Sequence, residues 1–117
     1  MINAIVDYLD QTLAALADPA RRAVVDLLRS EPMRASAIAE QSGMSRAAMS
    51  RHLGVLRKAG LVEVETPDDD ARARIYRLRP DHLVALQAWL DQVHAFWSEQ
   101  LGSFKQHAEH TRKERSR

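Results

Sequence analysis

The hydrophobic period of this chain changes at Gly60, from the spacing of a helix to the alternation of a strand. Before Gly60, apolar residues between positions 46 and 59 recur at intervals of three and four, which predicts an amphipathic helix. After it, residues 61–65 alternate apolar and acidic side chains, and residues 75–78 alternate again. The intervening residues 66–70 hold a proline and three aspartates, which favour a turn. A helix that leads directly into a β-hairpin with a charged tip is therefore expected.

Four further helices are predicted on either side of this unit. They span residues 2–16, 19–30, about 35–41 and about 81–110. Asp18 and Pro19 mark the start of the second helix, because Asp caps a helix and Pro fits its first position. Gly43 suits a left-handed turn after the third helix, and Ser45 is a cap for the fourth. At 117 residues, the whole chain (1–117) is expected to form a single domain.

Two helices joined by a glycine-containing turn and followed by a hairpin predict a winged helix-turn-helix, mainly α with a small β-hairpin wing. The wheel of the fourth helix divides into an apolar arc and an outward arc. The apolar arc holds Ala48, Met49, His52, Leu53, Val55, Leu56 and Ala59. The outward arc holds Arg46, Ala47, Ser50, Arg51, Gly54, Arg57 and Lys58. Small residues between two arginines suit a helix that reads base edges in the major groove of DNA.

Ser45 and the N-terminus of the fourth helix are expected to take a phosphate. The alternative for the outward arc is an ordinary solvated helix face. The wing adds Arg72 near its tip and Arg74 on its returning strand, and a guanidinium there can reach a phosphate or a narrow minor groove. The alternative for the wing arginines is that they balance the three aspartates at the tip.

The two terminal helices carry apolar stripes that predict a dimer interface. In the last helix, the stripe includes Leu83, Leu86, Leu90, Val93, Trp97, Leu101 and Phe104, and it is widened by Trp89 and Phe96. The first helix adds Ile5, Leu9 and Leu13. A domain of this size cannot cover so many large apolar residues on one long helix, so the stripe is expected to pack against a second copy. A ligand site lined by the two tryptophans is the alternative.

Three stretches of the chain resemble the ArsR family of bacterial winged-helix regulators. They are LADPARRAVVDLL, IAEQSGMSRAAMSRHLGVLRKAGLVEVE and ARARIYRL, and the resemblance runs from about Leu13 to Phe104. It implies a dimeric repressor of its own or an adjacent operon, which binds an inverted-repeat operator in double-stranded DNA. By position, the DNA contacts of the family fall on Arg46, Ala47, Ser50 and Arg51. The ending WLDQVHAFWSEQLGSFKQHAE resembles a cysteine-free subgroup often encoded beside START-like (SRPBCC) proteins, for which no metal inducer is implied.

Metal sensing is the main alternative within the family, as in metal-responsive ArsR/SmtB-type repressors. The candidate ligands lie in the last helix, in two pairs spaced by three residues: Asp91 with His94, and His107 with His110. The first pair and the gap between the pairs are offset from the metal-sensor pattern, and each residue of offset rotates a ligand by about 100°. No metal and no cofactor are therefore expected. His52 is expected to be a packed, hydrogen-bonded histidine, and nothing is assigned to His82.

The chain contains no cysteine, which excludes disulfides, thiolate metal sites and cysteine nucleophiles. No Gly-rich phosphate loop and no Ser-His-Asp setting are recognisable, so no catalytic residue and no enzyme activity are expected. The N-terminal stretch has no basic region before its apolar residues and carries Asp7 and Asp10, so neither a signal peptide nor a membrane partner is expected. These features favour a cytoplasmic, nucleoid-associated protein. A winged helix that binds protein instead of DNA is the remaining alternative, and the operator and inducer are not encoded in any pattern.

Overall fold

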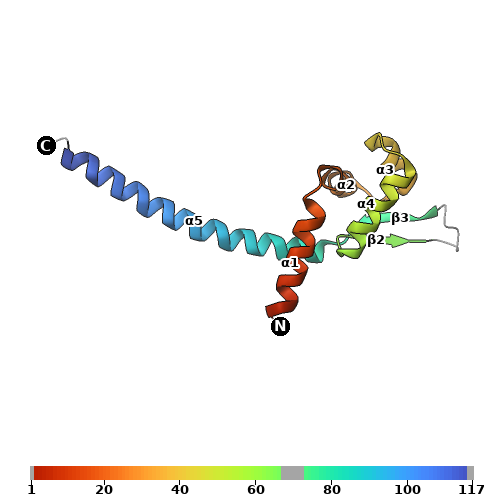
Figure 1. Cartoon of the computed structure of the whole chain (residues 1–117), viewed down its shortest axis with the longest axis horizontal. Coiled ribbons are helices and arrows are strands. Elements are labelled where there is room, and N and C mark those ends of the chain that lie inside the picture. The colour runs from red at the N-terminus through yellow and green to blue at the C-terminus, as the bar shows by residue number, and fades with distance from the viewer. Residues whose placement is uncertain (1, 67–72, 116–117) are drawn as a thin grey trace. The chain divides into compact units, whose positions relative to one another are not determined.

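The computed structural model describes the backbone of residues 2–66 and 73–115, with the side chains of residues 8–66 and 73–112. Within this part the chain forms five helices and three short strands (Figure 1). In order they are α1 (Ile2–Leu16), α2 (Pro19–Ser30), β1 (Met33–Arg34), α3 (Ala35–Ser42), α4 (Arg46–Lys58), β2 (Val62–Glu65), β3 (Ile75–Leu78) and α5 (Pro80–Arg115). The fold is the predicted winged helix-turn-helix. The chain divides into two compact units, Met1–Ala85 and Leu86–Arg117, and α5 begins in the first and continues through the second.

Side-chain caps begin the second and fourth helices where the sequence predicts them. The carboxylate of Asp18 accepts a hydrogen bond of 2.8 Å from the backbone N–H of Ala20, and Pro19 occupies the first turn of α2. The hydroxyl oxygen of Ser45 accepts one of 3.1 Å from the N–H of Ala48 at the start of α4. Each cap satisfies an N–H group that has no partner inside its helix, which stabilises the helix start.

Glycines in the left-handed region end α3 and α4. Gly43 has a φ of 65°, and the N–H of the next residue, Met44, donates to the carbonyl oxygen of Ala39 at 3.0 Å. Gly60 has a φ of 78°, and the N–H of Leu61 donates in the same way to Leu56 at 2.9 Å. Both ends are Schellman motifs, which stop a helix sharply and satisfy its last carbonyls. The short turn at Gly43 therefore joins α3 to α4, and Gly60 directs the chain into the wing.

The sheet has three antiparallel strands in the order β1-β3-β2. Strand β1 was not predicted, because two residues between Pro32 and α3 are too few to show an alternating pattern. Its Met33 pairs with Tyr76 of β3, and on the other side of β3 Tyr76 pairs with Val64 of β2. Strand β2 begins at Val62, one residue later than predicted. The extra strand makes β3 the central strand and places Tyr76 at its middle.

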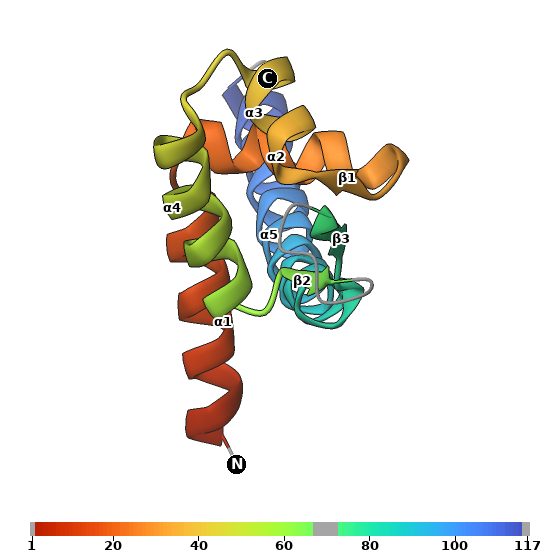
Figure 2. The same ribbon diagram turned by 90° about the vertical axis from the view of Figure 1, so that its right-hand side faces the viewer.

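The core of the first unit lies between α2, α3, α4 and the sheet, whose arrangement can be followed in Figure 2. The fully buried side chains are Val24, Ile38, Met49, Leu53, Leu56, Leu61 and Val62, together with Thr12, whose hydroxyl donates to the carbonyl of Tyr8. Burial of each large apolar side chain contributes about 1.5–3 kcal/mol. The core therefore fixes the inner face of α4, and with it the direction of the opposite face.

Helix α5 is longer than predicted at both ends, since it begins at Pro80 and continues to Arg115. Leu83, at its start, packs against the core of the first unit and is half-buried. Its place in the apolar stripe of the dimer interface stays a prediction. In the described part of the chain, no helix is long and apolar enough to cross a membrane.

Candidate nucleic-acid interface

The outward face of α4 is exposed over its whole length. All seven predicted positions lie on the surface: Arg46, Ala47, Ser50, Arg51, Gly54, Arg57 and Lys58. On the opposite face Met49, Leu53 and Leu56 are each at most 1% exposed. Val55 departs from the prediction, since it is 41% exposed although the wheel placed it on the apolar arc. It lies at the edge of that arc, beside a hollow that is lined by residues of α1, α2 and α4.

Three arginines on this side of the molecule have no anionic partner among the described residues. Arg46, Arg51 and Arg74 form no ion pair and no hydrogen bond within the described ranges 8–66 and 73–112. By contrast, Arg77 pairs with Glu65, and Arg79 lies 3.9 Å from the carboxylate of Glu63. The wing therefore neutralises the arginines at its base, whereas Arg74 has no anionic partner among the residues that the structure describes. Arg72, the second predicted wing contact, lies outside the described residues.

The start of α4 is a further place for an anion. The oxygen of Ser45 is already used as the cap, yet its hydroxyl proton is free to donate to a phosphate. Small side chains follow at Ala47 and Ser50, so the backbone of this turn is open to close approach. The described structure thus brings Ser45, Arg46, Ala47, Ser50 and Arg51 together on one exposed turn and a half of helix.

Sequence reasoning missed the arginine that holds α4 in position. The Nε atom of Arg21 donates to the carbonyl oxygen of Ala15 at 2.6 Å, and its Nη1 lies 3.3 Å from Nδ1 of His52 on α4. A carboxylate oxygen of Asp18 lies 3.6 Å from the same guanidinium. Arg21 therefore connects the end of α1, the start of α2 and the middle of α4. Its contact with His52, 31 residues further along the chain, leaves no local pattern to detect.

The same network accounts for the acidity of Asp18. The hydrogen bond from the N–H of Ala20 lowers the pKa of this carboxyl most, and the positive charge of Arg21 lowers it further. His52 is a packed, hydrogen-bonded histidine as predicted, with Nδ1 as the acceptor. Helix α4 is thus held in place by this charged cluster as well as by the apolar contacts of its inner face.

His82 also has a structural role that was not expected. Its Nδ1 lies 2.9 Å from the carbonyl oxygen of Ala59, to which it donates, and its ring stacks on Tyr8 with centroids 4.7 Å apart. A Cβ atom at Gly60 would lie 2.5 Å from the ring of His82. Gly60 is therefore required both by its backbone angle and by the closeness of this ring.

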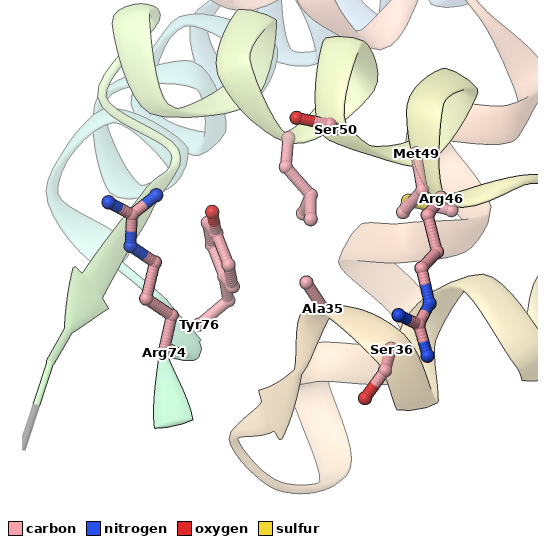
Figure 3. A pocket seen from close by; sticks show the side chains of 8 residues that line it. Ala35, Ser36, Arg46, Met49, Ser50, Arg74 and Tyr76 are labelled. Carbon is pink, nitrogen blue, oxygen red and sulfur yellow. The ribbon is translucent and has the colours of Figure 1, made fainter. Parts of the chain in front are cut away.

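A hollow of about 410 Å³ opens between α3, α4 and β3 (Figure 3). Its lining consists of Ala35, Ser36, Arg46, Met49, Ser50, Leu53, Arg74 and Tyr76. In Figure 3, Arg46 and Arg74 stand on opposite sides, and the hydroxyl of Tyr76 points into the space between them. Three of the predicted DNA contacts, Arg46, Ser50 and Arg74, therefore also line a cavity.

In the second unit, α5 exposes a band of large apolar side chains. Its members are Trp89, Leu90, Phe96, Trp97, Leu101 and Phe104, of which Trp97 is 56% and Phe104 71% exposed. The rings of Phe96 and Trp97 meet edge to face, with centroids 5.7 Å apart. Leu86 and Val93 of the predicted stripe are half-buried in the single chain, as is Leu9 of α1, whereas the side chain of Ile5 lies outside the described part.

The four candidate metal ligands of α5 do not form a metal site in the single chain. Asp91 accepts a hydrogen bond from Gln87 at 2.9 Å, and Nε2 of His94 lies 3.4 Å from the hydroxyl of Ser98. Among the described residues, no three His, Asp, Glu or Cys side chains come close enough to hold an ion.

Comparisons with known proteins identify the family. A helix-turn-helix domain model matches residues 16–65. The HTH-type transcriptional regulator Rv2034 of Mycobacterium tuberculosis is 38% identical over 97 residues, which cover 83% of this chain and 85% of that protein. An ArsR-like transcriptional regulator from Rhodococcus sp. RHA1 is 30% identical with a TM-score of 0.69, over 86% of this chain and 92% of that one.

A third relative is the homodimeric winged helix-turn-helix DNA-binding domain Mb0332 of Mycobacterium bovis. It is 32% identical with a TM-score of 0.63, over 80% of this chain and 82% of that one. Fold, exposed basic helix and relatives together define a DNA-binding transcriptional regulator of the winged helix-turn-helix class. The chain belongs to the ArsR family.

Proposed function

We propose that this regulator is a homodimeric repressor that reads an inverted-repeat operator through the first turns of α4. The observation that carries the proposal is a group of three arginines, Arg46, Arg51 and Arg74, beside the small residues of α4, with no partner among the described residues. A guanidinium can donate two hydrogen bonds to O6 and N7 of guanine, and small neighbours let the helix axis approach the base edges. We assign base contacts to Arg46, Ala47, Ser50 and Arg51.

Contacts to the DNA backbone are assigned to the ends of this surface. Ser45 donates to a phosphate beside the N-terminus of α4, where the helix dipole favours an anion. Arg74 reaches the sugar-phosphate backbone or the minor groove from the wing, together with Arg72. No DNA contact is assigned to Arg77 or Arg79, because each already has a carboxylate partner.

The dimer is proposed to form through α1 and α5, so that the whole chain acts as one DNA-binding domain with its terminal helices as the interface. Support comes from the apolar band of α5, which exceeds what a monomer of this size normally leaves in water. The relative Mb0332 is described as homodimeric. We assign the interface to Ile5, Leu9, Leu86, Leu90, Val93, Trp97, Leu101 and Phe104. A dimer seated on a promoter represses by excluding the polymerase, and this places the protein at the nucleoid.

The test is a mobility-shift titration with the DNA upstream of its own gene. Wild-type protein is expected to bind one or more upstream duplexes and to prefer them over a scrambled duplex of equal length. Arg51→Ala is expected to reduce this preference by about 1–3 kcal/mol. Arg29→Ala, which removes an exposed arginine from α2, is the matched control and should leave binding unchanged. Equal binding of upstream and scrambled DNA by the wild type would refute the proposal.

A further inference from the structure

We propose that the hollow between α3, α4 and β3 binds a small organic carboxylate with an aromatic or aliphatic body. The occupant competes with DNA, because it uses the same arginines. This competition rests on the proposed DNA contacts of Arg46 and Arg74, whereas binding to the hollow does not. The cavity of about 410 Å³ lies within the range of about 300–1,000 Å³ that is usual for small-molecule sites.

The hydroxyl of Tyr76 is the first observation that points to a ligand. The side chain of Tyr76 is only 9% exposed, and its hydroxyl points into the hollow (Figure 3). It forms no hydrogen bond with any residue that the structure describes. Solvent in the hollow reaches this hydroxyl, since Ser42 Oγ is the only side-chain polar atom of the described residues that is buried without a partner. The hydroxyl of Tyr76 is therefore available to donate a hydrogen bond to a ligand in the hollow.

The two arginines at the rim define the charge of that acceptor. Arg46 and Arg74 line the hollow from opposite sides, and neither has an anionic partner in the described structure. Guanidinium groups bind carboxylates through two parallel hydrogen bonds, which are among the stronger polar contacts in proteins. The first turn of α3, which begins at Ala35 without a side-chain cap, adds free N–H groups at the same wall.

The floor of the hollow selects an organic anion over a bare phosphate. The apolar part of the lining comes from Ala35, which is half-buried, and from the edges of the buried side chains of Met49, Leu53 and Tyr76. An inorganic anion or a backbone phosphate has no apolar part to cover this surface, whereas a carboxylate with a hydrocarbon body buries it. Polar groups at the rim with an apolar floor are the usual design of a small-molecule site.

Occupancy of the hollow is expected to release DNA. Arg46 and Ser50 belong both to the hollow and to the exposed turn of α4 that is assigned to the major groove. A carboxylate bound there neutralises Arg46 or Arg74 and adds negative charge beside the path of the phosphates. Both effects oppose the binding of a polyanion.

The probe for the test is 2-naphthoate, added to the whole protein without DNA and followed in ¹⁵N–¹H spectra. Saturable shifts are expected for amides of α3, the first turns of α4 and β3. The neutral 2-naphthamide and inorganic phosphate at the same concentrations are expected to cause no comparable shifts. Equal responses to either of these, or no saturable response to 2-naphthoate, would overturn the proposal.

Matched pairs of variants localise the site. Tyr76→Phe removes only the hydroxyl, and Arg74→Gln removes the guanidinium with its charge, so each is expected to weaken 2-naphthoate binding by about fivefold or more. Tyr8→Phe and Arg77→Gln make the same changes at residues outside the hollow and should leave the affinity unchanged. Unchanged affinity in both Tyr76→Phe and Arg74→Gln would show that the probe binds elsewhere. Because Arg74 is exposed, its variant remains informative even if Tyr76→Phe disturbs folding.

Competition is measured separately, by fluorescence anisotropy of a labelled duplex that the protein binds. Saturating 2-naphthoate is expected to weaken DNA binding at least about tenfold, as mutual exclusion requires. If the DNA affinity is unchanged when 2-naphthoate saturates the protein, the proposed competition is wrong. If the protein binds no duplex, the proposed function fails, while the titration without DNA still decides whether the hollow is a carboxylate site.

Discussion

The Nη1 atom of Arg21 lies 3.3 Å from Nδ1 of His52, a contact that fixes α4 to the junction between α1 and α2. The same guanidinium donates to the last-turn carbonyl of Ala15 at 2.6 Å. One side chain thus satisfies orphan groups at the end of one helix and positions the inner face of the helix assigned to DNA. The orientation of α4 therefore depends on a residue that is not itself expected to touch DNA.

Arg21→Gln is expected to destabilise the protein by about 1–3 kcal/mol, because it breaks hydrogen bonds of a half-buried charged group. The measurement is urea unfolding followed by circular dichroism, at one fixed protein concentration since dimer formation adds to stability. Arg29→Gln, an exposed arginine on the same helix, is the control and should change stability by less than about 0.5 kcal/mol. Equal effects of the two variants would contradict the role of Arg21.

Asp18 is expected to make stability depend on pH in the acidic range. Its pKa is lower in the folded protein than in the unfolded chain, because the folded state donates the Ala20 N–H to the carboxylate. The contribution is complete above the ordinary Asp pKa of about 3.9 and is lost as the pH falls through the lower folded-state pKa. Asp18→Asn keeps a capping side chain but cannot titrate, so its stability should fall less between pH 5 and the most acidic measurable pH. Parallel curves for the two proteins would rule this out.

The same substitution is expected to have opposite effects at two glycines. Gly60→Ala should destabilise by about 2 kcal/mol or more, because φ is 78° and the new Cβ would lie 2.5 Å from the His82 ring. Gly54→Ala meets nothing within 4 Å in the middle of α4 and should stabilise by about 1 kcal/mol. Thermal unfolding without DNA compares the two. A stabilising Gly60→Ala would show that the close approach of His82 does not constrain this turn.

Arg74→Gln is expected to weaken binding to every duplex by a similar factor and to reduce the slope of log K against log salt by about one. A phosphate contact carries no sequence information, so the ratio of specific to non-specific binding should not change. Arg77→Gln, whose charge is already paired with Glu65, is the control and should keep the wild-type slope. A change in base preference at one position in Arg74→Gln would instead assign Arg74 to a base.

Local signals explain why most of the fold could be predicted from the sequence. Asp18, Gly43 and Ser45 act on neighbouring backbone groups within a few residues, so their caps and turns appear directly in the sequence. The outward face of α4 could be predicted for the same reason, because helical period alone separates it from the core. The end of the first wing strand at Glu65 also follows its alternation.

Contacts between distant segments explain what could not be predicted. Strand β1 depends on the pairing of Met33 with Tyr76, and the position of Arg21 depends on His52, 31 residues further along the chain. The exposure of Val55 depends on how the end of α1 and the start of α2 pack beside α4, and not on its own neighbours in sequence. The hollow likewise forms only when α3, α4 and β3 pack together, so no single sequence motif predicts it.

Selection of bound duplexes from a random DNA library tests the central claim most directly, because it reports both the reading helix and the dimer. Wild-type protein is expected to enrich an inverted repeat with half-site centres about 34–36 Å, or 10–10.5 base pairs, apart. Arg51→Ala should enrich the same repeat with preference lost at one position in each half-site, while Arg29→Ala should reproduce the wild-type site. Enrichment of an isolated half-site, or an Arg51→Ala site identical to the wild-type one, would contradict the account.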